Sequence, residues 1–156
     1  MFNQILVPLD GSSFSEAVLP QVSALAQCTG AKVTLLRVIP TILYNLGFAA
    51  TTRLPLQANP EYDSRTVAET YLERIASEHF PGNLNVQIEV MSGVAADVIY
   101  EYAIAQKVDA IAMTTHGRSG MSRLMLGSVA EEIVQRSHLP VLLVRPTPEP
   151  IPQHAF

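Results

Sequence analysis

The chain has 156 residues, 48% of them hydrophobic, and its 14 acidic and 10 basic side chains leave a formal net charge of −4. This length fits a single domain, and no apolar run is long enough to span a bilayer. The negative charge, without any lysine or arginine cluster, excludes a protein that binds polymeric nucleic acid through a basic surface.

Alternating extended and helical patterns begin at the N-terminus. An apolar run at 4–10 predicts a strand, and helical spacing over 14–30 ends at Gly30, a residue typical of helix C-termini. Proline lacks the amide hydrogen that a helix interior needs, so we expect a local kink at Pro20. A second strand is predicted at 32–40.

Residues 41–60 show no sustained hydrophobic period and contain one glycine and two prolines. Long segments of this kind are usually functional or mobile loops. The apolar content is high for a loop in solvent, which indicates a lid over a ligand or a docking site for a partner protein.

The rest of the chain continues the alternation, with helices predicted at 61–80, 94–108 and 128–138 and strands at 85–93, 109–117 and 140–146. The strand at 109–117 has no polar alternation before Thr114, which is typical of strands buried on both faces of a parallel sheet. Five strands separated by helices predict an α/β fold, a five-stranded parallel doubly wound sandwich. We divide the chain into one domain, 1–146, and a proline-rich C-terminal tail, 147–156.

The segment between the fourth strand and the last helix carries three glycines, Gly117, Gly120 and Gly127, and Ser128 opens the helix. Glycine lets a backbone approach an anion closely, and a helix N-terminus offers amide hydrogens and the positive end of its dipole. We therefore predict that amide hydrogens after the fourth strand are free to meet a phosphate. The sequence contains neither a P-loop motif nor the glycine motif of the Rossmann fold.

Asp10 after the first strand, HGRSG at 116–120, LMLGS at 124–128 and HLPVLLVRP at 138–146 together resemble the universal stress protein family. The resemblance covers nearly the whole domain. Nucleotide-binding members of this family carry G-x-x-G, nine residues, and then G-[ST]. Gly117, Gly127 and Ser128 match the later positions, whereas Thr114 stands where the motif has its first glycine.

The resemblance implies an adenine nucleotide alpha hydrolase-like fold with strand order 3-2-1-4-5, in which a ligand binds where the order reverses, between the first and fourth strands. It also implies that the ligand is ATP or another adenine nucleotide, with Mg²⁺ as a possible companion. Asp10 would contact the adenosine part and Val38 the base or ribose. The full set of candidate binding residues is Asp10, Val38, Thr114, His116, Gly117, Arg118, Gly120, Gly127 and Ser128.

Some candidates also have roles that need no ligand. Asp10 fits a helix cap or an Asx turn, and Ser128 with Glu131 has the S-x-x-E pattern of a capping box. Glu131 and Glu132 would also place negative charge close to a phosphate. His116 precedes the glycines, but the sequence assigns it no nucleophile and no acidic partner, which favours a loop histidine without a catalytic role.

The resemblance leads us to expect a homodimeric stress-response protein that binds an adenine nucleotide as a regulatory or signalling module. We expect it in the cytoplasm, because the N-terminus shows no export signal. The resemblance implies a dimer through the edge strand at 140–146, although the tail could cover that edge instead. Two alternatives stay open, a nucleotide-independent dimer that docks a protein through loop 41–60 and a slow ATP-hydrolysing enzyme. We assign no catalytic residue and no metal site, since Cys28 is the single cysteine and the histidines are scattered.

Overall fold

The computed structural model of the protein describes residues 2–40, 60–115 and 126–146. Its elements follow the predicted alternation: β1 (Gln4–Leu9), α1 (Ser13–Glu16), α2 (Leu19–Thr29), β2 (Lys32–Ile39), α3 (Pro60–His79), β3 (Val86–Ser92), α4 (Ala95–Ala105), β4 (Ala110–Thr114), α5 (Ser128–Arg136) and β5 (Val141–Val144). The loop predicted at 41–60 lies outside the described residues except for Pro60, which begins α3. The tail, 147–156, also lies outside them.

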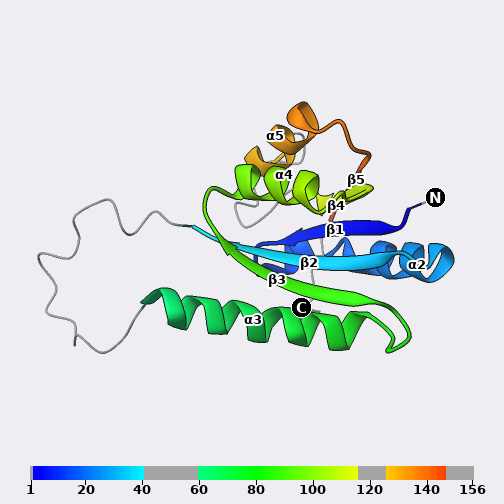
Figure 1. The fold of residues 1–156 in the computed structure, drawn as a ribbon, viewed down its shortest axis with the longest axis horizontal. Coiled ribbons are helices and arrows are strands. Elements are labelled where there is room, and N and C mark those ends of the chain that lie inside the picture. Colours follow the sequence, from blue (N-terminus) through cyan, green and yellow to red (C-terminus); the bar gives the residue numbers. More distant parts are fainter. Residues whose placement is uncertain (1, 41–59, 116–125, 147–156) are drawn as a thin grey trace, which may run out of the picture.

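The five strands form one parallel sheet in the order β3-β2-β1-β4-β5, which confirms the expected order. Figure 1 shows α4 and α5 together on one side of this sheet and α3 running along β2 and β3 on the other. The order reverses between β1 and β4, because β1 pairs with β2 on one side and with β4 on the other. The carboxyl ends of β1 and β4 therefore lie side by side.

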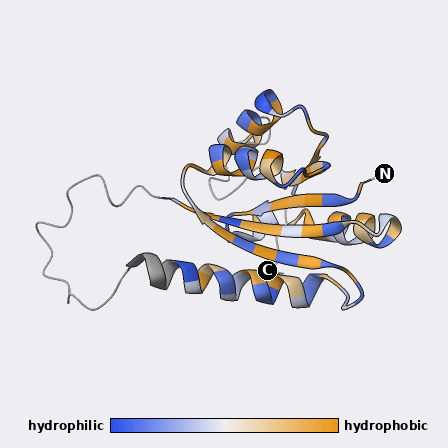
Figure 2. Ribbon diagram, in the orientation of Figure 1, coloured by the Kyte–Doolittle hydropathy of each residue, from blue (hydrophilic) through white to orange (hydrophobic). Residues whose placement is uncertain are grey.

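Two hydrophobic cores hold the layers together, one on each face of the sheet. Val7 and Leu35 pack with Leu72 and other residues of α2 and α3, whereas Leu6 and Ile111 pack with α4 and α5. Every residue of β4 is buried, as its unalternating apolar sequence predicts. Figure 2 shows the same pattern, with hydrophobic residues concentrated along the central strands.

The kink expected at Pro20 is a complete break in the helix. α1 ends at Glu16 and α2 begins at Leu19, so that Pro20 lies in the first turn of α2. An amide in that turn has no acceptor within the helix, and proline therefore costs little there. Gly30 ends α2 with φ of 73°, and its amide donates to the Ala26 carbonyl at 2.8 Å, as expected for a helix-terminating glycine.

No helix in the described segments combines the length and the apolar character that crossing a membrane would require.

Gly93, which joins β3 to α4, should tolerate no side chain. Its φ is 152°, and a Cβ atom built on it would lie 2.6 Å from Cγ2 of Val98. We expect Gly93→Ala to lower the free energy of unfolding by about 1–3 kcal/mol, measured by urea denaturation.

Gly82 provides the matched control for that substitution. A Cβ atom there would meet nothing within 4 Å, and its φ is not in the positive range. We expect Gly82→Ala to change stability by no more than about 0.5 kcal/mol. Equal losses in the two variants would contradict the strain assigned to Gly93.

Candidate functional site

A cavity of about 290 Å³ lies where the strand order reverses, at the carboxyl ends of the central strands. Small-molecule sites have volumes of about 300–1,000 Å³, so this cavity is near the lower limit. The switch point of a doubly wound sheet is also the position at which such folds bind their ligands. The lining residues are Pro8, Leu9, Asp10, Ser15, Leu36, Arg37, Val38, Ala95, Ile99, Met113, Thr114, Thr115, Gly127, Ser128, Val129 and Ala130.

One wall of the cavity is apolar. Leu36 and Val38 from β2, Met113 from β4 and Ile99 from α4 are buried and belong to the core between the sheet and α4 with α5. The rest of the lining carries polar groups, including Asp10 and Ser128. Such a cavity can take a ligand with a flat apolar part and a polar or charged part.

The structure brings five of the candidate residues to this one cavity, although they come from four separate segments. Asp10 follows β1, Val38 lies near the end of β2, Thr114 ends β4, and Gly127 with Ser128 begins α5. The remaining candidates, His116, Gly117, Arg118 and Gly120, lie outside the described residues.

Asp10 is held in an Asx turn. Its Oδ1 atom accepts hydrogen bonds from the Ser12 amide at 2.9 Å and from the Ser12 hydroxyl at 2.5 Å. Ser12, not Asp10, is the N-cap of α1, and its Oγ accepts a hydrogen bond from the Ser15 amide. Of the two local roles that the sequence suggested for Asp10, the structure therefore shows the Asx turn. Asp10 still lines the cavity.

The prediction that the amide hydrogens after β4 are free to meet a phosphate is wrong for two of them. The Thr115 amide donates to the Val144 carbonyl at 3.0 Å, and the Gly127 amide donates to the Thr115 carbonyl at 2.6 Å. These two amides are therefore not free for an anion, because they close the ladder with β5 and bring α5 back to the sheet. Within α5, the first backbone bond comes from the Glu131 amide to the Gly127 carbonyl. The amides of residues 128–130 precede it and so have no acceptor within the helix. These three residues line the cavity.

The capping box predicted for Ser128 and Glu131 is absent. Gly127 occupies the N-cap position with φ of −62° and ψ of 150°, and no side chain caps the helix with a hydrogen bond. Ser128 is the first helical residue and lines the cavity instead. Glu131 and Glu132 are not among the lining residues, and Glu132 pairs with Arg136 at 2.7 Å. Their charges thus oppose an anion less than the sequence suggested.

Sequence reasoning missed Arg37, which precedes Val38 and also lines the cavity. Its Nη1 atom donates to the Leu9 carbonyl at 3.3 Å and so joins the ends of β2 and β1. Within the described part of the lining, Arg37 and Asp10 are the charged residues. The sequence signal that could have identified Arg37 is its charge, since it lies near the end of a strand next to the switch point and directly before Val38.

The described segments contain no group of three or more histidine, cysteine, aspartate or glutamate side chains that could hold a metal ion.

Comparison with known proteins identifies the family. The model of the universal stress protein family matches residues 1–145. Universal stress protein MJ0577 of Methanocaldococcus jannaschii is 28% identical over 155 residues, which cover 93% of this chain and 96% of that protein. The solved structure of MJ0577 aligns with a TM-score of 0.79 at 26% identity, covering 94% of this chain and 98% of the other.

Two more distant structures share the fold. A universal stress protein solved in complex with cAMP aligns with a TM-score of 0.63 at 18% identity, covering 92% of this chain and 97% of that one. The universal stress protein of Archaeoglobus fulgidus in complex with dAMP aligns with a TM-score of 0.58 at 17% identity and the same coverage. The family model spans the whole described sheet and every helix, and the chain therefore belongs to the universal stress protein family.

Proposed function

We propose that this protein binds an adenine nucleotide in the cavity between the ends of β1 and β4 and acts as a stress-response regulatory module. The observation that carries the proposal is the convergence of Asp10, the apolar surface at Val38 and the N-terminus of α5 on one cavity. Relatives with the same fold have been solved with cAMP and with dAMP, both of which are adenine nucleotides.

The polarity of the cavity suggests how the ligand would lie. The base would pack against Val38 and the apolar wall, and the Asp10 carboxylate would accept hydrogen bonds from the ribose hydroxyls. The phosphates would meet the amides at residues 128–130, which have no acceptor within α5, and the positive end of the α5 dipole. Gly117 and Ser128 would surround the phosphates, together with His116, Arg118 and Gly120. If Mg²⁺ enters with ATP, it would neutralise phosphate charge.

Titration with ATP, ADP and AMP tests the proposal. A ligand at one hundred times its Kd stabilises the folded state by about 2.7 kcal/mol, which raises Tm by about 5–10 °C for a domain of this size. We expect such a rise with at least one of the three nucleotides and none with inorganic phosphate alone. A Tm that none of the nucleotides changes would refute the proposal.

A second function is favoured by Thr114 and by the two occupied amides. Thr114 is buried at the end of β4 and lines the cavity. Family members with the nucleotide-binding motif G-x-x-G, nine residues, G-[ST] carry glycine at this position. Under this alternative the protein is a nucleotide-independent dimer that docks a partner through loop 41–60. Thr114→Gly separates the two functions: if only the variant binds nucleotide, the natural chain has the second function.

We also propose that the protein is a homodimer through the edge strand at residues 140–146. Among the described strands, β5 pairs only with β4, which leaves its outer edge available to another chain. Leu142 on this strand is 38% exposed. Sedimentation equilibrium of the natural chain should give the mass of two copies, and a monomer would refute this part of the proposal.

A further inference from the structure

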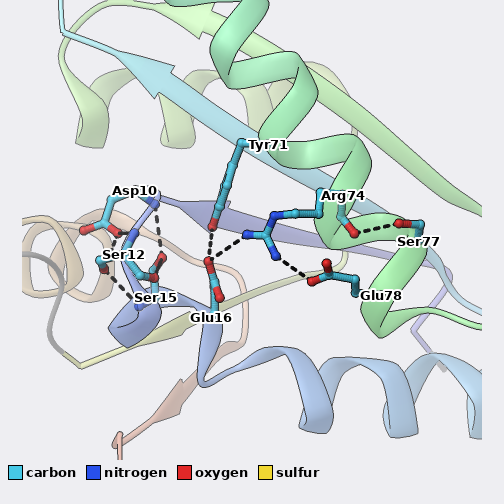
Figure 3. Close-up of polar contacts among 8 residues, drawn as sticks. All are labelled: Asp10, Ser12, Ser15, Glu16, Tyr71, Arg74, Ser77 and Glu78. Atoms are coloured by element: carbon cyan, nitrogen blue, oxygen red, sulfur yellow. Dashed lines mark hydrogen bonds and ion pairs between the residues drawn. The ribbon is translucent and has the colours of Figure 1, made fainter.

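Helix α3 is linked by polar contacts to the turn that carries Asp10, on the sheet face opposite α4 and α5. The Tyr71 hydroxyl donates to Oε1 of Glu16 at 3.0 Å, and Nη2 of Arg74 lies 3.7 Å from the same oxygen. Figure 3 shows Tyr71 and Arg74 pointing from α3 toward Glu16 at the end of α1. Glu16 is thus the point at which two side chains of α3 meet the short helix α1.

The Tyr71 contact is the shorter and more buried of the two. The tyrosine ring packs against the core under α3, and the Glu16 side chain is only 23% exposed. Burial raises the pKa of Tyr71 well above its usual value, and the hydrogen bond to Glu16 raises it further. The hydroxyl therefore keeps its proton and remains a donor at neutral pH. Arg74 is more exposed and also pairs with Glu78, so its hold on Glu16 is weaker.

The backbone of α1 connects Glu16 to a set of hydrogen bonds at the cavity, and the Glu16 amide itself donates to the Ser12 carbonyl at 3.3 Å. Ser15, the neighbour of Glu16, is buried, donates from Oγ to the Ser12 carbonyl at 2.9 Å, and accepts from the Asp10 amide at 3.3 Å. Ser12 in turn donates to the Asp10 carboxylate through its amide and its hydroxyl. Figure 3 shows two groups of contacts, one among Asp10, Ser12 and Ser15 and one between Glu16 and α3. The backbone of α1 joins them, because Glu16 follows Ser15 directly.

α1 needs such an external anchor. It has four residues, and α2 starts separately after the break before Leu19. A single helical turn has too few internal hydrogen bonds to be stable by itself, so contacts outside it must hold it in place. The hydrogen bond from Tyr71 to Glu16 ties this turn to the long helix α3, with the weaker Arg74 contact beside it.

We propose that Tyr71 is a positioning residue for the nucleotide site, because it anchors α1 through Glu16 and so fixes the Asp10 carboxylate at the cavity. This inference rests on the proposed function. Tyr71 is not among the residues that line the cavity, and it acts only through the turn.

The first experiment compares single variants by calorimetric titration with AMP and ATP. Tyr71→Phe removes one hydroxyl and keeps the ring, and we expect it to raise Kd about three- to tenfold, the effect of one lost hydrogen bond. Tyr100→Phe is the matched control, since Tyr100 is also outside the cavity and its ring lies under Arg136. Equal Kd values for Tyr71→Phe and the natural chain would overturn the proposal.

Two replacements of Glu16 test the same bond from the other side. Glu16→Gln keeps a carbonyl oxygen that can accept from Tyr71, whereas Glu16→Ala keeps none. We expect the alanine variant to match Tyr71→Phe and the glutamine variant to keep most of the affinity. Affinity lost equally in both would assign the effect to the charge of Glu16 and overturn the role of the hydroxyl.

A double-mutant cycle separates positioning from general destabilisation. If Tyr71 acts through the Asp10 carboxylate, Tyr71→Phe should cost no further affinity in a protein that already carries Asp10→Ala. A general structural role predicts instead that the two losses multiply. Fully multiplicative losses would therefore overturn the proposal.

Amide hydrogen exchange tests the anchor without any nucleotide. The Asp10 and Ser15 amides donate within the turn, and we expect both to exchange faster in Tyr71→Phe than in Tyr100→Phe. Unchanged exchange would overturn the proposal. If the natural chain binds no nucleotide, the proposed function fails, and the exchange rates alone then decide whether Tyr71 holds the turn.

Discussion

Val38→Phe should weaken binding of AMP and ATP at least a hundredfold, which corresponds to about 2.7 kcal/mol. Val38 lies near the end of β2 and lines a cavity of only about 290 Å³. A phenyl ring there would occupy the space against which the base would pack. Isothermal titration calorimetry measures the loss directly.

Met91→Phe is the control for this prediction. Met91 is paired with Val38 in the register between β2 and β3, but it is 38% exposed and does not line the cavity. We expect this variant to keep the affinity of the natural chain. Binding that survives in Val38→Phe would place the nucleotide somewhere other than this cavity.

Leu72→Ala should lower the free energy of unfolding by about 2–5 kcal/mol, the largest effect on stability that we predict. Leu72 lies on α3, is fully buried, and packs with the core between that helix and the sheet. Truncation removes buried methyl groups and leaves a cavity that the surrounding strands cannot fill completely. Urea denaturation followed by circular dichroism gives the size of the loss.

Val67→Ala on the same helix serves as the reference, because Val67 is 70% exposed. Its free energy of unfolding should stay within about 0.5 kcal/mol of the natural chain. Similar losses in the two variants would contradict the assignment of this effect to the buried face of α3, because alanine itself favours a helix.

The order and type of the elements could be predicted from the sequence because periodicity reports burial directly. β4 illustrates this: its four consecutive apolar residues before Thr114 predict burial on both faces, and all four are buried. Gly30 is a second example, since its position after a helical pattern predicts the left-handed cap that the structure shows. The strand order came from the family resemblance and not from the periodicity.

The candidate site was predictable in part. The switch-point argument and the family motif led to Asp10, Val38 and Thr114, which the structure places around one cavity. The same reasoning predicted that the amides after β4 are free, whereas two of them donate hydrogen bonds within the chain. Sequence alone does not show which carbonyl an amide reaches, because Thr115 and Val144 are neighbours only through the pairing of β4 with β5.

By itself, the sequence determined the alternation of helices and strands, because it depends on residues close together along the chain. It also limited the local role of Asp10 to a helix cap or an Asx turn, and the structure shows the Asx turn. The tertiary structure alone decided that Arg37 borders the cavity and that Tyr71 bonds to Glu16, 55 positions earlier. Contacts between residues so far apart in the sequence depend on how the elements pack against one another, and no local pattern of residues predicts that packing.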